Sequence, residues 1–72
     1  MRVGIVSIGT ELLLGEVVDT NASYLASQLP LVGLDLQTVI LVSDCIQSLT
    51  EAFEQAWRRF DIVLATGGLG PT

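Results

Sequence analysis

The chain has 72 residues, half of them apolar, and a net charge of −5 from eight acidic residues against three arginines. This acidic balance argues against nucleic acid or an anionic membrane as a partner. No apolar run approaches the roughly 18 residues of a membrane span, and the amino terminus lacks a signal-peptide pattern, so we expect a cytoplasmic protein.

The first half of the chain predicts a strand, a loop and a helix. The strand covers about Arg2–Ile8, and the loop runs from Gly9 to about Asp19. A helix over Asn21–Leu31 follows, capped by Thr20 or Asn21. Pro30 should close its last turn, and Gly33 suits the left-handed residue after a helix. The spacing typical of one buried face is shown by Ala22, Leu25, Ala26 and Leu29.

The second half predicts a strand, a helix and a strand. The run from Leu36 to Val42 is continuously apolar toward its end, as in a strand covered on both faces. The lone cysteine beyond it, Cys45, excludes an intrachain disulfide and is expected to be structural. A helix over Ser48–Phe60 begins with a Ser48–Glu51 capping box, and the last strand is Ile62–Ala65. The apolar stripe expected in the core is Leu49, Ala52, Phe53, Ala56, Trp57 and Phe60.

This β-α-β-α-β order with short connections predicts an α/β fold with a parallel sheet and right-handed crossovers. Strand orders 1-2-3 and 2-1-3 both remain open. We favour 2-1-3, because it places the two helices on opposite faces, as both buried strands require. A chain this short buries only roughly 60% of its unfolded surface. We therefore expect residues 1–72 to be the amino-terminal part of one larger domain, ending just after a glycine-rich loop.

The strongest motif is that final loop, Thr66-Gly67-Gly68-Leu69-Gly70-Pro71-Thr72. Three glycines within four residues after a parallel strand leave backbone N–H groups bare for an anion. The loop is not a Walker loop, because no Gly-Lys-Ser/Thr ending occurs. An ordinary turn seldom needs this composition. We expect ligand contact from Thr66, Gly67, Gly68, Gly70 and Thr72.

A second loop of similar character, Gly9-Thr10-Glu11, follows the first strand. Ligands of open parallel sheets lie outside the carboxyl ends of the strands, so the two loops should frame one phosphate-type site. Glu11 is either a solvated loop carboxylate or a group that binds a divalent cation or a ligand hydroxyl. The Asp19-Thr20-Asn21 segment suits a helix cap, and Asn21 could also contact a ligand. Asp44 suits a capping or loop role.

The motifs together resemble the CinA-type competence/damage-inducible proteins, and more broadly the molybdopterin-binding domain of molybdenum-cofactor biosynthesis proteins and gephyrin. The resemblance covers the whole chain. It is carried by Gly9-Thr10-Glu11-Leu12-Leu13-Leu14-Gly15-Glu16, Asp19-Thr20-Asn21, Val42-Ser43-Asp44 and Asp61 to Thr72.

The resemblance implies a three-layer αβα domain about twice this length and, in many members, a carboxyl-terminal nicotinamide-nucleotide amidase domain. It also implies metal-dependent hydrolysis of ADP-ribose to AMP and ribose 5-phosphate. Gly67, Gly68 and Gly70 would then bind phosphate, Glu11 would face ligand or metal, and Asn21 would be a polar site residue. The family's catalytic aspartates would lie beyond Thr72.

Three hypotheses stay open on this basis. The intact protein is a metal-dependent ADP-ribose pyrophosphatase, or it is a molybdopterin-binding module without hydrolysis, or the 72-residue piece has no activity of its own. We favour the first for the intact protein, which we expect to be a homo-oligomer with a nucleotide or pterin ligand and a divalent metal ion. For this piece alone we expect no activity.

Overall fold

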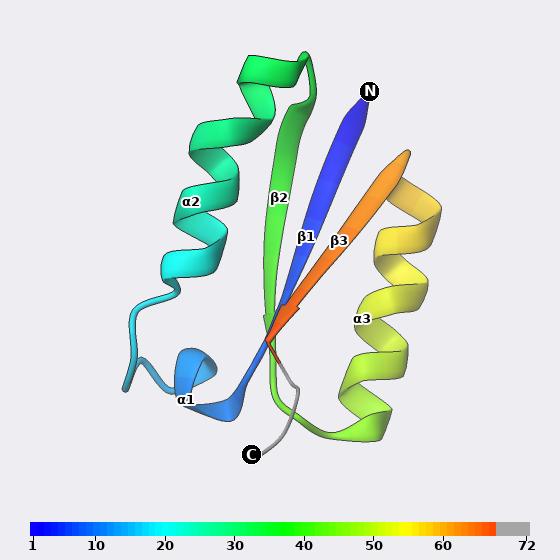
Figure 1. The fold of residues 1–72 in the computed structure, drawn as a ribbon. Coiled ribbons are helices and arrows are strands. Elements are labelled where there is room, and N and C mark those ends of the chain that lie inside the picture. The colour runs from blue at the N-terminus through cyan, green and yellow to red at the C-terminus, as the bar shows by residue number, and fades with distance from the viewer. Residues whose placement is uncertain (68–72) are drawn as a thin grey trace.

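The computed structural model describes residues 1–67, and within them three strands form one parallel sheet. The strands are β1 (Arg2–Ile8), β2 (Asp35–Val42) and β3 (Ile62–Gly67), in the order β2-β1-β3 (Figure 1). The predicted α/β class and the order 2-1-3 are therefore confirmed. No helix in residues 1–67 is both long and apolar enough to cross a bilayer.

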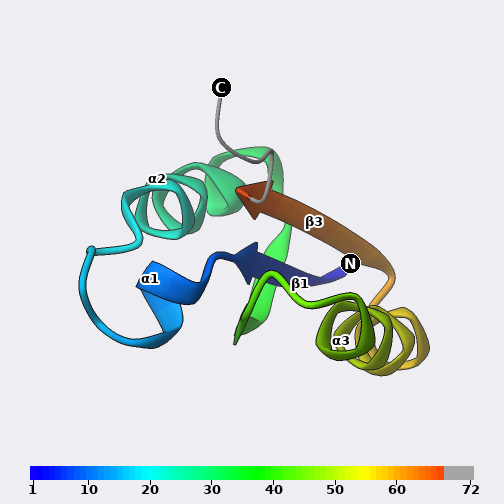
Figure 2. The ribbon, with the colours of Figure 1, turned by 90° about the horizontal axis from the view of Figure 1, so that it is seen from below.

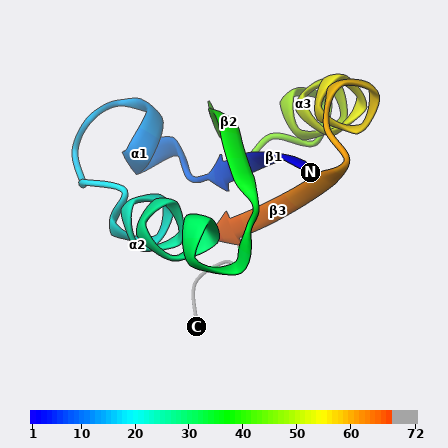
Figure 3. The ribbon, with the colours of Figure 1, turned by 90° about the horizontal axis from the view of Figure 1, so that it is seen from above.

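Two longer helices cover opposite faces of this sheet. Helix α2 (Thr20–Gln28) packs on one face, and α3 (Ile46–Arg59) packs on the other (Figures 2 and 3). Right-handed crossovers explain this arrangement, because the step from β1 to β2 and the step from β2 to β3 run in opposite directions across the sheet. The predicted placement of the helices is confirmed.

The central strand β1 is buried because a helix lies on each of its sides. Val3 and Ile5 pack toward α2, whereas Val6 packs toward α3. This alternation fixes the strand register, since a slip of one residue would exchange the two faces. The α3 side of the core also contains Val42, Ala52, Ala56 and Phe60, and the α2 side contains Ala22 and Leu29.

Gly4 lies directly under the side chain of Phe60, the residue that follows α3. Gly4 points to the α3 face, and a Cβ atom there would overlap the ring of Phe60. Phe60 is buried, with 8% of its surface exposed. The absence of a side chain at residue 4 therefore makes room for the aromatic ring that ends α3.

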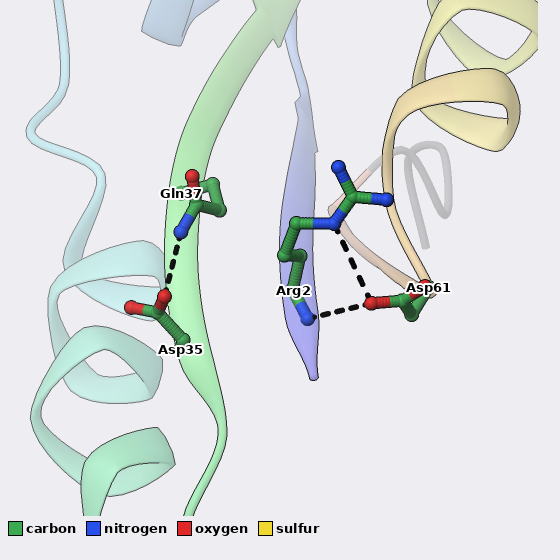
Figure 4. A network of polar contacts seen from close by, with 4 residues as sticks. All are labelled: Arg2, Asp35, Gln37 and Asp61. Atoms are coloured by element: carbon green, nitrogen blue, oxygen red, sulfur yellow. Dashed lines mark hydrogen bonds and ion pairs between the residues drawn. The ribbon is translucent and has the colours of Figure 1, made fainter.

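The edge of the sheet where the strands begin is held by polar contacts between distant parts of the sequence (Figure 4). The backbone N–H of Arg2 donates to Asp61 Oδ2 at 2.8 Å, and the N–H of Asp61 donates to the Arg2 carbonyl at 3.0 Å. The Arg2 guanidinium also lies 3.6 Å from the same carboxylate oxygen. On β2, Gln37 Nε2 donates to Asp35 Oδ2 at 2.6 Å.

Several boundaries differ from the sequence predictions. The predicted loop after β1 contains a short helix, α1 (Thr10–Leu13). Helix α2 is capped by Asp19, whose Oδ1 accepts from the Ala22 N–H at 3.1 Å, and not by Thr20 or Asn21. A 3-10 turn, η1 (Leu29–Val32), contains Pro30 and ends at Gly33 with φ 78°, as expected for the left-handed position.

Helix α3 also differs from its prediction at the start. It begins at Ile46, two residues before the predicted Ser48, with Cys45 in the cap position and no side-chain cap bond. The Ser48–Glu51 capping box is therefore wrong, because Ser48 already lies inside the helix. Cys45 is exposed, so its assignment as a buried structural residue is wrong as well.

Three apolar side chains predicted for the helix cores are exposed. Ala26 on α2 is exposed, and on α3 the exposed fractions are 36% for Phe53 and 80% for Trp57. The physical reason on α3 is rotation, because Phe53 and Trp57 lie about a quarter of a turn away from the line that meets the sheet. The apolar stripe of α3 is thus wider than the part of the helix that packs against the sheet in residues 1–67.

The expectation that β2 is covered on both faces is also wrong for the described chain. Val39 and Leu41 are 41% and 42% exposed. Their register partners on β1 are Ile5 and Ser7, so both lie on the α2 face. Strand β2 forms an edge of the described sheet, and α2 leaves this part of the face open.

Candidate functional site

Strands β1 and β3 end side by side at the carboxyl edge of the sheet, at the bottom of Figure 1. Ile8, the last residue of β1, pairs with Gly67, the last residue of β3. Gly9 follows Ile8 directly, so the two predicted ligand loops leave the sheet from neighbouring positions. The prediction that they share one edge is confirmed for residues up to Gly67. Predicted ligand residues Gly68, Gly70 and Thr72 lie outside the described residues.

Gly67 has a backbone conformation and an environment that only glycine fits. Its φ is 80°, in the left-handed region. A Cβ atom there would also collide with the carbonyl oxygen of Ile8. The first glycine of the Thr-Gly-Gly motif is therefore required by the close approach of the β1 and β3 backbones.

Gly9 serves a different purpose from the one that the sequence suggested. Its N–H donates to the Val42 carbonyl at 2.9 Å, so this amide is not free to bind an anion. Its φ of 161° is extended backbone that any residue adopts. A Cβ atom on Gly9 would instead lie 2.6 Å from Glu11 Oε1. The glycine thus leaves space for the Glu11 carboxylate to fold back over the end of β1.

Thr10 and Glu11 form the first turn of α1, and both are exposed. The carbonyl of Gly9 accepts from the N–H groups of Leu12 and Leu13, both at 3.1 Å, which fixes the start of this helix. Within residues 1–67, the one ion pair is Arg2–Asp61, at the opposite edge of the sheet. Glu11 therefore presents an unpaired carboxylate beside the end of β1.

Ser7 is a polar residue at this edge that the sequence reasoning missed. It is completely buried, and its Oγ has no hydrogen-bond partner within the described chain. Its neighbours in register are Leu41 on β2 and Thr66 on β3. Thr66, a predicted ligand residue, is half-buried. The signal in the sequence is a serine that stands between Val6 and Ile8 in a buried strand.

The amino terminus of α2 lies at the same end of the molecule as the carboxyl ends of the strands (Figure 1). Asp19 caps it through Oδ1, while Oδ2 is buried and without a partner in residues 1–67. Asn21 is exposed in the first turn. A helix amino terminus attracts anions through its free N–H groups. The cap and the predicted polar role of Asn21 are therefore compatible.

The connection from β2 to α3 brings two further groups to this end of the sheet. Asp44 is exposed, and Cys45 occupies the cap position of α3. The backbone N–H of Ser48, followed by that of Gln47, holds the pKa of the Cys45 thiol below its ordinary value.

The described part of the chain offers few ligands for a metal ion. Residues 1–67 contain no cluster of three or more His, Cys, Asp or Glu side chains that could hold one. Glu11 can supply a single carboxylate at the carboxyl edge. A divalent cation bound there needs several further oxygen ligands.

Comparison with known proteins identifies the family. Residues 4–72 match the family described as "Probable molybdopterin binding domain". A CinA-like protein of Kosmotoga olearia is 44% identical over all 72 residues, and a protein of Alkaliphilus oremlandii named for competence-damage induction is 53% identical. The crystal structure of CinA from Thermoplasma acidophilum, described as of unknown function, superposes with a TM-score of 0.92 at 32% identity.

The chain spans only part of these proteins. It covers 18% of the Kosmotoga relative, 17% of the Alkaliphilus relative and 44% of the crystallised CinA chain, and each match includes all 72 residues. The family match and the structural superposition both include the residues at the carboxyl edge of the sheet, where β1 and β3 end. The chain belongs to the molybdopterin-binding domain family, among its CinA-type, competence-damage-inducible members.

Proposed function

We propose that this chain is the nucleotide- or phosphate-binding part of a metal-dependent ADP-ribose pyrophosphatase. The observation that supports the proposal is the pairing of Ile8 with Gly67, because Gly9 and Gly67, one from each of the two predicted ligand segments, then lie at the same edge of the sheet. In parallel α/β sheets this edge is where ligands bind. The 72-residue piece alone is proposed to be inactive, because the catalytic aspartates that the family resemblance implies would lie beyond Thr72.

The chemistry assigns separate tasks to the groups at this edge. The chain has only three cationic side chains, and Arg2 lies at the opposite edge, paired with Asp61. Phosphate binding therefore depends on backbone N–H groups of the glycine loop and the α2 amino terminus. Glu11 would supply one ligand of a divalent ion whose identity is open, and that ion would neutralise the bridging phosphates. The remaining ligands would be carboxylates beyond Thr72.

The alternative is a molybdopterin-binding module that performs no hydrolysis. The description of the matching family favours it, and the same edge would accept the pterin phosphate. The two functions differ in whether the bound ligand is hydrolysed, and they use the same site geometry. A homo-oligomeric state of the intact protein also stays a prediction.

The test of the proposed function is Glu11→Gln in the full-length protein that contains this chain. Glutamine keeps the shape of the side chain and removes the charge that would hold a metal ion. We expect ADP-ribose hydrolysis to fall at least tenfold at limiting metal, with a melting temperature close to that of the wild type. The matched control is Glu51→Gln on the exposed side of α3, which should turn over normally.

The outcomes separate the two functions. Hydrolysis that is abolished by a chelator and restored by a divalent ion supports the pyrophosphatase. A wild-type protein that retains a pterin chromophore and releases no AMP selects the molybdopterin-binding module. Normal turnover by the Glu11→Gln variant at limiting metal would contradict the assignment of Glu11 to the site.

A further inference from the structure

Two buried oxygen atoms, Ser7 Oγ and Asp19 Oδ2, have no hydrogen-bond partner within residues 1–67. Ser7 is completely buried in β1. Asp19 is the cap of α2, and its other carboxylate oxygen accepts from the Ala22 N–H. Burying a hydroxyl group or a carboxylate oxygen without a partner lowers stability, so such atoms are normally paired. The positions of these two atoms indicate how they are paired.

Ser7 and Asp19 both point into the layer between β1 and α2. Side chains alternate along a strand, so Ser7 points to the same face as Ile5, which belongs to the α2 side of the core. Residues three apart share one face of a helix, so Asp19 lies on the same side of α2 as Ala22, another buried member of that core. The two polar groups therefore face one another.

The two groups also lie at a similar height along the strands. Helix α2 runs antiparallel to β1, with its amino end toward the ends of the strands (Figure 1). Ala22 comes from the amino end of α2 and Ile5 from the later part of β1, so these two core residues lie nearest the carboxyl edge. From Ala22 back to Asp19 the helix spans about 4.5 Å, and from Ile5 to Ser7 the strand spans about 6.6 Å in the same direction. Asp19 is thus the α2 residue placed over Ser7.

The chemistry of the two groups is complementary. A serine hydroxyl can donate a hydrogen bond, whereas a carboxylate oxygen accepts one. They do not bond directly within residues 1–67, and a single water molecule commonly links buried polar groups that lie near each other. We propose that Ser7 is a positioning residue, whose hydroxyl group holds Asp19 Oδ2 through one buried water molecule and ties the amino end of α2 to the carboxyl end of β1.

This link deepens the proposed function and rests on it, because phosphate binding was assigned in part to the N–H groups at the amino terminus of α2. Those groups serve a ligand only when they are held at a fixed place beside the carboxyl edge. Asp19 orders the first turn of α2 through Oδ1, and Ser7 fixes that turn against the sheet through Oδ2. Ser7 acts through α2 and touches no ligand itself.

The test uses the full-length protein and two substitutions that each remove one end of the link. Ser7→Ala removes the hydroxyl group. Asp19→Ser keeps a side-chain oxygen for the helix cap and removes Oδ2. Ile5→Val, at a buried position on the same face of β1, is the matched control for a general loss of packing. Melting temperature, hydrogen exchange in the first turn of α2 and the kinetics of the proposed ADP-ribose hydrolysis are measured.

We expect Ser7→Ala to lower the melting temperature by about 2–4 °C, because Asp19 Oδ2 loses its partner. In the Asp19→Ser background the same substitution should have little further effect. A hydroxyl group that is buried without a partner predicts the opposite sign, since its removal is neutral or stabilising. A Ser7→Ala variant that melts at or above the wild-type temperature, or strict additivity of the two substitutions, would therefore overturn the link.

The positioning role has readouts of its own. Ser7→Ala should speed hydrogen exchange in the first turn of α2 and raise KM severalfold with kcat nearly unchanged, and Ile5→Val should do neither. Normal exchange, or a normal KM in an active enzyme, would overturn this role. If the wild-type protein does not hydrolyse ADP-ribose, the proposed function fails, while melting and exchange still decide whether Ser7 holds Asp19.

Discussion

Three glycines within or next to β1 and β3 act through three different physical effects. Gly4 leaves space for a buried ring, Gly67 adopts a left-handed backbone beside the Ile8 carbonyl, and Gly9 leaves space for a carboxylate. Only Gly67 depends on the conformational freedom of glycine. For Gly4 and Gly9 the effect of a substitution depends on how easily the neighbouring side chain can move.

Gly4→Ala should lower the stability of the fold. The added methyl group overlaps the Phe60 ring, which is buried in the α3 side of the core and has little room to shift. Overpacking of this kind costs about 1–3 kcal/mol. Thermal or denaturant unfolding measures the loss. In a double-mutant cycle, Phe60→Leu should recover part of it, and strict additivity of the two substitutions would contradict the contact.

Gly9→Ala should leave stability nearly unchanged and impair function. The extended φ of residue 9 accepts alanine, and the atoms nearest to the added methyl group belong to the flexible end of Glu11. The carboxylate is pushed away from the end of β1, so turnover in the full-length protein should fall in the same direction as for Glu11→Gln. Assays of the proposed ADP-ribose hydrolysis and melting curves measure the two effects. A large loss of stability with normal turnover would show that the packing argument is wrong.

At the scale of elements, the start of α2 is fixed by a single side chain. Asp19 lies in a non-helical conformation and accepts the Ala22 N–H, which is the geometry of an N-cap. Helix α3 has no such bond and relies instead on its packing, through Ala52, Ala56 and Phe60, against the sheet. The two helices of one fold are therefore stabilised in different ways.

Asp19→Ala should destabilise the chain by about 0.5–2 kcal/mol, the usual cost of losing an N-cap. Thr20→Ala is the control, since Thr20 is exposed and is not the cap. Unfolding curves of both variants measure the difference. Equal stability of the two variants would contradict the assignment of the cap to Asp19.

At the scale of the whole molecule, the Arg2–Asp61 contact joins the beginning of the chain to the beginning of β3. The backbone N–H of Arg2 is the main cause that holds the pKa of the Asp61 carboxyl below its ordinary value, and the Arg2 charge adds to it. A lowered folded-state pKa means that the contact stabilises the fold above the ordinary carboxyl pKa of about 4. This contribution is lost as the pH falls through the lower folded-state value.

Asp61→Asn should therefore make the stability of the chain less dependent on pH below about 4, where the wild type loses the contact. At neutral pH the variant should be slightly less stable, because both side chains of the pair are exposed and such pairs contribute little. Acid-unfolding curves measure the effect. Asp35→Asn, at the same edge but with its carboxylate bonded to Gln37 and not to Arg2, is the control, and an identical response of both variants would argue against this role.

The local pattern was enough to predict the order of the main elements, and it left two strand orders open. Apolar runs marked the three strands, and Pro30 and Gly33 marked the end of the first long helix. Handedness then selected 2-1-3, because the order 1-2-3 would place both helices on one face. Family membership followed from the two glycine motifs, which the comparisons confirm.

Features that depend on neighbours in space could be decided only by the tertiary structure. Which part of the α3 stripe is buried depends on the rotation of the helix against the sheet, so periodicity included Phe53 and Trp57 with the core. Gly9 looked like an anion-binding glycine, but its N–H is used by Val42. Ser7 became noticeable once its burial was known. The sequence determined which segments pair, and three-dimensional packing decided which side chains those pairs cover and which groups remain free for a ligand.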